Sequence, residues 1–140
     1  MQHRSPPHNS LRPAVMIAAC MMSLTAALAL ADVYRQRSEK RAAAVAMTKG
    51  DPDRAPAIFR RYGCAGCHTI PGIAGADGKV GGDLSALRER VYIAGVLNNS
   101  ADNLVGWIVM PQAHSPKTAM PATGISDQEA RDLAAYLYAN

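Results

Sequence analysis

The sequence predicts a small all-α domain that occupies residues 51–140. No segment of the chain alternates apolar and polar residues with the period of two that is typical of a half-buried strand. Ser126 and Glu129 have the spacing of a capping box, and they precede a run with the apolar periodicity of a helix. A domain of this size with one Phe and one Trp buries little apolar surface, so we expect an additional stabilising group inside it.

Two segments precede the domain. We expect residues 1–31 to be an export signal or a transmembrane anchor, and residues 32–50 to be a stalk or linker. Residues 14–31 carry no charge, and this run is at the lower limit for a spanning helix of about 17–25 residues. It is long for the apolar part of a signal peptide. Four basic residues follow the run and weaken the positive-inside bias of an anchor: Arg35, Arg37, Lys40 and Arg41. Both interpretations therefore stay open.

The stalk is expected to be helical. From Asp32 to Lys49 the chain has good helix formers, including an alanine-rich run at residues 42–47, and it has no proline.

The first helix of the domain has two candidate starts. Asp51 can cap a helix with Pro52 at its first position, or the helix can begin at Ala55, before Pro56. In either case the helix carries an apolar stripe made of Ile58, Phe59 and Tyr62.

The stretch from Cys64 to His68 carries the clearest chemical signal. Two cysteines separated by two residues and followed at once by histidine form the pattern of a c-type haem attachment site. Each thiol can add across one vinyl group of the porphyrin, and the imidazole can bind the iron from below. The pattern predicts one haem c, attached through Cys64 and Cys67, with His68 as an axial ligand of the iron.

Other uses of these cysteines fit less well. A structural zinc site needs four ligands, and His114 is the only further histidine after the N-terminal segment. The third cysteine, Cys20, lies in the apolar run, so the chain offers no disulfide framework. A thioredoxin-like redox pair would need a βαβ pattern, which this sequence lacks.

The middle of the domain is expected to be irregular. Residues 69–82 contain a proline and five glycines, so they predict a loop. We expect short helical pieces at Leu84 to Arg90 and at Tyr92 to Leu97.

Two more helices complete the predicted domain. Ser100 can cap a helix that ends at Met110, and its apolar face consists of Leu104, Trp107 and Ile108. A second loop is expected from Gln112 to Gly124. The capping box then opens the final helix, whose apolar face consists of Ala130, Leu133, Ala134 and Leu137.

The charge distribution argues against nucleic-acid binding. The whole chain has a net charge of +4, but residues 51–140 contain eight basic and nine acidic side chains. The positive charge is therefore concentrated before the domain, whereas a nucleic-acid-binding domain carries a basic face of its own.

Together these features resemble a class I c-type cytochrome over residues 51–140, with a small cytochrome c fold around one haem. The shared features are an N-terminal helix, the Cys-x-x-Cys-His motif, a Gly-rich loop, and Met-Pro before a C-terminal helix. Three stretches resemble more narrowly the single-haem cytochromes that serve haem–copper terminal oxidases, including those fused to or associated with oxidase subunit II: residues 92–95, 103–108 and 117–138.

The resemblance implies that Met120 is the second axial ligand of the iron. Met110 also precedes a proline, and His114 lies between the two methionines, so both stay open as alternatives. The family usually has a polar residue where Met110 stands.

The resemblance also implies a support for the proximal histidine. The family often has a proline at the position of Gly82, and the carbonyl of that residue accepts the Nδ1–H of the histidine. We expect Gly82 to keep this role with less rigidity. Trp107, Tyr92 and Arg90 are expected either as neighbours of the haem or as ordinary core and surface residues.

The function implied by the resemblance is electron transfer, with no enzymatic activity and no small-molecule substrate. The expected partners are a quinol-oxidising bc-type complex as donor and a haem–copper oxidase as acceptor. The expected location is the bacterial inner membrane, held by the N-terminal segment, with the haem domain facing the periplasm, or the periplasm itself if that segment is cleaved. The alternative is a haem sensor or peroxidase-like cytochrome with a labile sixth ligand.

Overall fold

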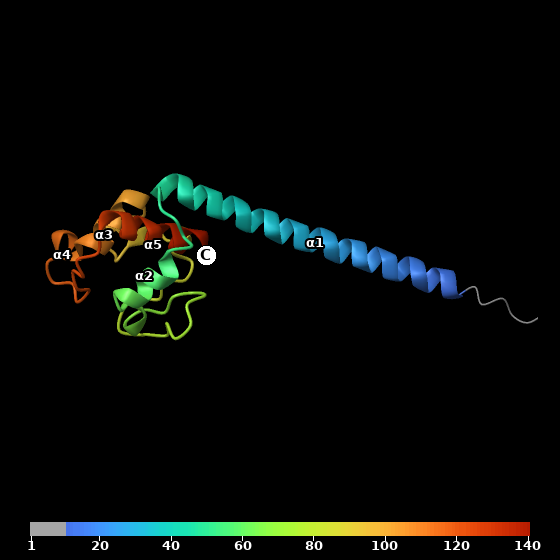
Figure 1. Ribbon diagram of the computed structural model, residues 1–140, viewed down its shortest axis with the longest axis horizontal. Coiled ribbons are helices and arrows are strands. Elements are labelled where there is room, and N and C mark those ends of the chain that lie inside the picture. The colour runs from blue at the N-terminus through green and yellow to red at the C-terminus, as the bar shows by residue number, and fades with distance from the viewer. Residues whose placement is uncertain (1–10) are drawn as a thin grey trace, which may run out of the picture. The chain divides into compact units, whose positions relative to one another are not determined.

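The computed structural model describes residues 11–140, and its contacts divide the chain into two units at the bond between Gln36 and Arg37. The structure is mostly helical, as predicted (Figure 1). Its helices are α1 (Leu11–Thr48), α2 (Ala55–Arg61), α3 (Ala101–Val109), α4 (Pro111–His114) and α5 (Asp127–Ala139), with short 3₁₀ turns η1 (Cys64–Gly66) and η2 (Leu87–Glu89).

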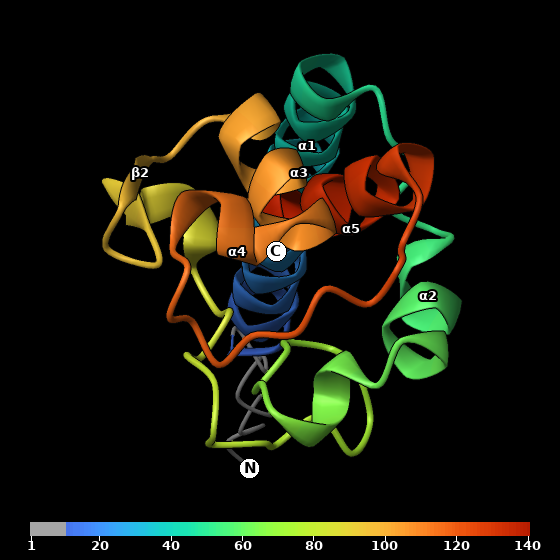
Figure 2. The same ribbon diagram turned by 90° about the vertical axis from the view of Figure 1, so that its left-hand side faces the viewer.

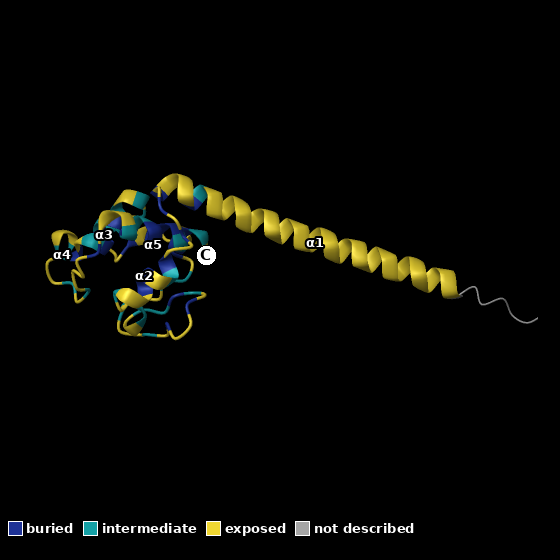
Figure 3. Ribbon diagram, in the orientation of Figure 1, coloured by how far each residue is buried: buried dark blue, intermediate teal, exposed yellow. Residues whose placement is uncertain are grey.

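In the first unit, the side chains of residues 12–36 are exposed (Figure 3). By length and composition, α1 is apolar enough to cross a membrane, and a signal sequence near the N-terminus has the same properties. A helix that is apolar on all sides is typical of a membrane environment.

The core of the second unit forms where α2 and α3 pack against α5 (Figure 2). The predicted apolar face of α5 is confirmed, because Ala130, Leu133, Ala134 and Leu137 are buried. The predicted capping box is also present: Ser126 accepts from the Glu129 amide, and the Glu129 carboxylate accepts from the Ser126 amide. Phe59 of α2 meets Tyr136 of α5 edge to face, with ring centroids 5.5 Å apart.

The structure selects the later of the two candidate starts for α2, at Ala55. Ile58 and Phe59 are buried and Tyr62 is half-buried, which confirms the predicted stripe. Asp51 accepts instead from the Asp53 amide in a local turn, at 3.0 Å.

The predicted cap of α3 is confirmed, because the Ser100 side chain accepts from the Asn103 amide. Leu104, Trp107 and Ile108 are buried, and the helix ends at Met110. The loop predicted from Gln112 begins instead with one helical turn, α4. Pro111 occupies the first helical position there, where its fixed φ favours a new turn.

The helical piece predicted at Tyr92 to Leu97 is wrong. These residues form a small antiparallel hairpin, β1 (Tyr92–Ile93) and β2 (Leu97–Asn98). Its turn contains Ala94 and Gly95 with φ of 51° and 75°. A right-handed helix cannot include two residues with positive φ, whereas a tight hairpin turn uses them.

The second unit includes residues 37–50, which the sequence analysis assigned to the stalk or linker. Ala44 and Thr48 are fully buried. The Thr48 carbonyl accepts from Arg131 at 3.2 Å, and the Asp51 amide donates to the Asp132 carboxylate at 2.8 Å. We call these contacts between residues 48–54 and α5 the junction.

Candidate functional site

The cysteine motif folds into a compact turn at the end of α2. Gly63 adopts a left-handed conformation with φ of 68°, which lets the chain leave α2 and enter η1. The carbonyl of Cys64 then accepts from the amides of Cys67 and His68 at 3.2 and 3.0 Å. The turn therefore brings together the backbones of the three predicted haem-binding residues.

Both cysteines of the motif are free thiols that differ in exposure. Cys67 is exposed and Cys64 is half-buried. Burial raises the pKa of the Cys64 thiol, and the neighbouring Cys67 adds to this effect. The Cys64 side chain packs against the apolar core, so the motif is anchored on one side and open on the other.

The imidazole of His68 is oriented by a backbone carbonyl. Its Nδ1 lies 2.6 Å from the carbonyl oxygen of Gly82, so the expected contact between these two residues is confirmed. A carbonyl can only accept a hydrogen bond, so Nδ1 carries the proton in the neutral ring. The lone pair of Nε2 is then available to a metal ion.

Glycines in the loop of residues 69–82 allow this close packing. A Cβ atom on Gly81 would lie 2.4 Å from Cε1 of His68, and one on Gly78 would lie 2.5 Å from the carbonyl carbon of Cys67. The Gly81 amide also donates to the Cys67 carbonyl at 2.7 Å. The sequence marked these glycines only as loop residues and did not reveal that two of them touch the motif.

Met120 is the best packed of the three candidates for a second ligand. Its side chain is half-buried and packs against the core. Its carbonyl accepts from the Gln112 side chain at 2.7 Å, and its amide donates to the Thr118 hydroxyl at 3.3 Å. In Figure 2 the segment between α4 and α5 runs below these two helices, on the side of the green turn that follows α2. Sequence reasoning missed Gln112, because nothing local to it indicates this contact.

The two alternative ligands have other surroundings. The side chain of Met110 is 56% exposed. His114 is exposed, and its ring lies beside Trp107 with centroids 6.5 Å apart. Within residues 11–140, no cluster of three or more Cys, His, Asp or Glu side chains could hold a metal ion, so the zinc alternative gains no further ligand.

The other predicted haem neighbours differ in their environments. Trp107 is buried and Tyr92 is 56% exposed. Arg90 is exposed and donates to the carbonyls of Asp83 and Ser85. It therefore fixes the segment that follows Gly82.

The residues present fit a haem c. Cys64 and Cys67 supply two free thiols at the required spacing, and His68 supplies an imidazole with Nε2 available. Met120 supplies a thioether, and hydrogen bonds to its carbonyl and its amide hold its backbone.

Comparisons with known proteins point in the same direction. A family model described as cytochrome c matches residues 52–139. The cytochrome c oxidase subunit 2 of Alkalihalophilus pseudofirmus is 36% identical over 81 residues. The aligned part covers 57% of this chain and 23% of that protein, so the chain spans less than a quarter of the relative's length. No solved structure was found to match the chain.

Proposed function

The chain belongs to the cytochrome c family, and from this premise we propose that residues 51–140 bind one haem c and act as a one-electron carrier. The observation that carries the proposal is the orientation of His68 by the Gly82 carbonyl, at 2.6 Å, beside two free thiols. This arrangement leaves the lone pair of Nε2 available to an iron atom, because Nδ1 carries the proton.

Each site residue has a defined role in this proposal. The thiols of Cys64 and Cys67 would hold the haem through two thioether bonds to its vinyl groups. Nε2 of His68 and the sulfur of Met120 would bind its iron. When bound, the haem supplies a couple between ferrous and ferric iron, and a methionine ligand raises its reduction potential.

The protein residues keep both axial ligands in place and leave one edge of the site accessible. Gly82 holds the imidazole, and Gln112 and Thr118 hold the backbone of Met120. Cys67 is exposed, so electrons would enter and leave at the edge of the haem near this residue. With His68 and Met120 both bound to the iron, no position would remain for a substrate, so the proposed role is that of a carrier and not of an enzyme.

The proposed partners are redox proteins of a bacterial respiratory chain. The similarity to an oxidase subunit 2 supports a haem–copper oxidase as electron acceptor, and a bc-type complex is the corresponding donor. The apolar part of α1 supports retention in the inner membrane as an anchor, with the haem domain on the periplasmic side. Residues 1–31 then remain on the mature protein.

Mass spectrometry of the native protein tests the attachment and the anchor together. We expect the mass of the full chain plus one haem. A mass without haem would contradict the carrier proposal, and a mass without residues 1–31 would contradict the anchor.

Carbon monoxide tests the axial ligands. Stable ligation by Met120 predicts that the ferrous protein binds carbon monoxide slowly and incompletely, and that Met120→Ala binds it rapidly. Rapid, complete binding by the unmodified protein would favour the sensor or peroxidase-like alternative instead. A Met110→Ala variant is the matched control, because it removes the other methionine that precedes a proline.

A further inference from the structure

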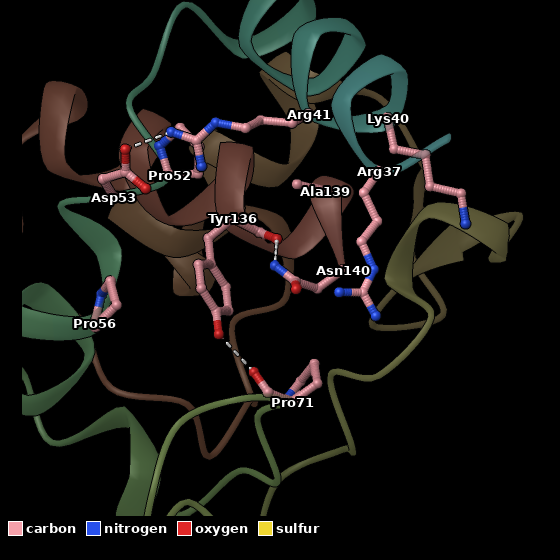
Figure 4. Close-up of a pocket in the computed structure, with 10 residues that line it drawn as sticks. All are labelled: Arg37, Lys40, Arg41, Pro52, Asp53, Pro56, Pro71, Tyr136, Ala139 and Asn140. Carbon is pink, nitrogen blue, oxygen red and sulfur yellow. Dashed lines mark hydrogen bonds and ion pairs between the residues drawn. The ribbon is translucent and has the colours of Figure 1, made fainter. Parts of the chain in front are cut away.

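A pocket of about 630 Å³ lies in the unit of residues 37–140, and none of the cysteine-motif residues lines it (Figure 4). One side consists of Arg37, Lys40 and Arg41 from the last turns of α1. On another side the Tyr136 hydroxyl donates to the Pro71 carbonyl at 2.7 Å, which closes the pocket there. Neither the haem site nor the proposed electron transfer uses this pocket.

The basic side chains of the pocket are only partly neutralised. Arg41 pairs with Asp53 at 2.5 Å and with Asp51 at 3.9 Å, so carboxylates balance its charge. Within residues 11–140, neither Arg37 nor Lys40 forms an ion pair through its side chain, and Figure 4 shows both at the pocket. Two positive charges beside one cavity favour an anionic occupant.

The geometry of these two side chains suits a phosphate group. A guanidinium presents a planar pair of N–H donors that matches two phosphate oxygens, and a lysine ammonium adds a mobile point charge. Pro52, Pro56 and Ala139 supply apolar surface in the same pocket. A ligand with a phosphate and an adjoining aliphatic part would use both kinds of wall.

The position of the pocket in the chain indicates where such a ligand comes from. Arg37 follows Ala31, the last residue of the uncharged run, by six residues. Even a fully extended chain of that length covers only about 21 Å. If the run spans the membrane, Arg37 stays close to the headgroup layer of the leaflet from which the chain emerges. Basic residues next to a span are attracted to anionic headgroups.

We propose that this pocket binds the phosphate headgroup of an anionic phospholipid from the membrane that holds the protein. The proposal rests on the anchor of the proposed function. It also gives a reason for two of the basic residues that follow the uncharged run and weaken the positive-inside bias. Arg37 and Lys40 recognise a lipid there instead of setting the direction of insertion.

The test uses the full-length, haem-loaded protein in detergent, with native mass spectrometry as the readout. Phosphatidylglycerol or phosphatidylcholine is added in equal amounts, and the lipid molecules retained per protein are counted. We expect one phosphatidylglycerol to be retained and phosphatidylcholine to be lost. In the double variant Arg37→Gln, Lys40→Gln, retention should fall about tenfold or more.

Arg35→Gln is the control for the loss of one basic charge, because Arg35 is even closer to the uncharged run than Arg37 but does not line the pocket. Its retention of phosphatidylglycerol should equal that of the unmodified protein. The proposal would be overturned if Arg35→Gln lost as much phosphatidylglycerol as the double variant, or if the unmodified protein retained both lipids equally. Either result would indicate general attraction to a charged surface. Displacement of the lipid by an equal concentration of inorganic phosphate would show a soluble ligand and overturn the membrane source.

The same spectra separate this proposal from the proposed function. If the spectra show both the haem and residues 1–31 but no preference for phosphatidylglycerol over phosphatidylcholine, only the lipid site is contradicted. A missing haem contradicts the carrier, and missing residues 1–31 contradict the anchor and the lipid source with it. An unchanged haem absorption spectrum in each variant confirms that the substitutions leave the fold intact.

Discussion

The Nδ1 atom of His68 and the carbonyl oxygen of Gly82 lie 2.6 Å apart, although 14 positions separate the two residues in the chain. Because the acceptor is a backbone carbonyl, any residue at position 82 can supply it. The choice of glycine therefore affects how rigidly the acceptor is held, and not whether it exists.

Gly82→Pro should stabilise the haem-loaded protein. The Gly82 amide donates no hydrogen bond within residues 11–140, and a Cβ atom there would meet no atom within 4 Å. Proline restricts the unfolded chain, so we expect the free energy of unfolding to rise by about 0.4–1 kcal/mol. Denaturation in guanidinium chloride measures this. Gly75→Pro is the control and should lower stability, because φ at Gly75 is 77° and proline cannot adopt it.

Gly81→Ala should disturb the proximal ligand. The added methyl group would lie 2.4 Å from Cε1 of His68, so the imidazole or the loop must move. We expect a loss of about 1–3 kcal/mol in the free energy of unfolding, and an altered reduction potential. Denaturation and redox titration measure the two effects. Gly66→Ala, in open space within the motif, should change neither, and equal effects in both variants would contradict the packing explanation.

Gln112→Ala should weaken the hold on Met120. The substitution removes the hydrogen bond from the Gln112 side chain to the Met120 carbonyl. One such bond contributes about 0.5–1.5 kcal/mol, so the apparent affinity of the ferrous protein for carbon monoxide should rise about two- to twelvefold. A carbon monoxide titration measures it. Gln128→Ala, which loses hydrogen bonds to Lys49 and Asp132 instead, should leave this affinity unchanged. An unchanged affinity in Gln112→Ala would argue against Met120 as the ligand.

Asp132→Ala should destabilise the junction. Asp132 is fully buried, accepts from the Asp51 amide, and lies 3.3 Å from the Arg54 guanidinium, without the geometry of a hydrogen bond. Arg54 is more than half exposed, so water screens the ion pair. The main cost is that the Asp51 amide and the Gln128 side chain both lose Asp132 as their acceptor. We expect the free energy of unfolding to fall by about 1–3 kcal/mol, measured by thermal denaturation.

Asp102→Ala is the control for that variant. Asp102 pairs with Arg131 at 3.7 Å, but its side chain is 89% exposed, so we expect a change of at most about 1 kcal/mol. Equal effects of the two substitutions would show that burial of Asp132 does not matter.

Tyr138 should make the stability fall in strong alkali. Burial raises the pKa of Tyr138 to about 12, and its hydroxyl donates to Asn99 at 2.6 Å. The pKa of tyrosine in the unfolded chain is about 10. Below that pH the folded and unfolded states both keep the proton, so the free energy of unfolding is not reduced. Between about pH 10 and 12 only the unfolded state loses the proton, so about 2–3 kcal/mol of stability is lost there.

Tyr138→Phe should show a smaller fall over this range, measured by denaturation at each pH. Tyr92→Phe, at an exposed position, should behave like the unmodified protein. An identical pH dependence in all three proteins would contradict the assignment to Tyr138.

The elements that the sequence predicted well are those encoded by neighbouring residues. Ser126 and Glu129 form a cap within one helical turn, and the apolar spacing of α5 requires only that one face be buried. The cysteine motif is also local, and its role in haem attachment stays a prediction. The hairpin was missed because its turn places Ala94 at positive φ. Alanine rarely adopts this conformation, so its presence in the sequence does not predict such a turn. Gln112 and Gly81 were missed because their roles depend on contacts with segments elsewhere in the chain.

Gly50 limits where the polypeptide can be shortened or modified. A Cβ atom at this position would lie 2.1 Å from the carbonyl oxygen of Arg131, so no larger residue fits against α5. A truncated protein that begins at residue 51 would also lose the buried side chains of Ala44 and Thr48, and the Thr48 carbonyl that accepts from Arg131 of α5. A soluble version of the haem domain should therefore begin at residue 37, and a protease site or affinity tag belongs before that position.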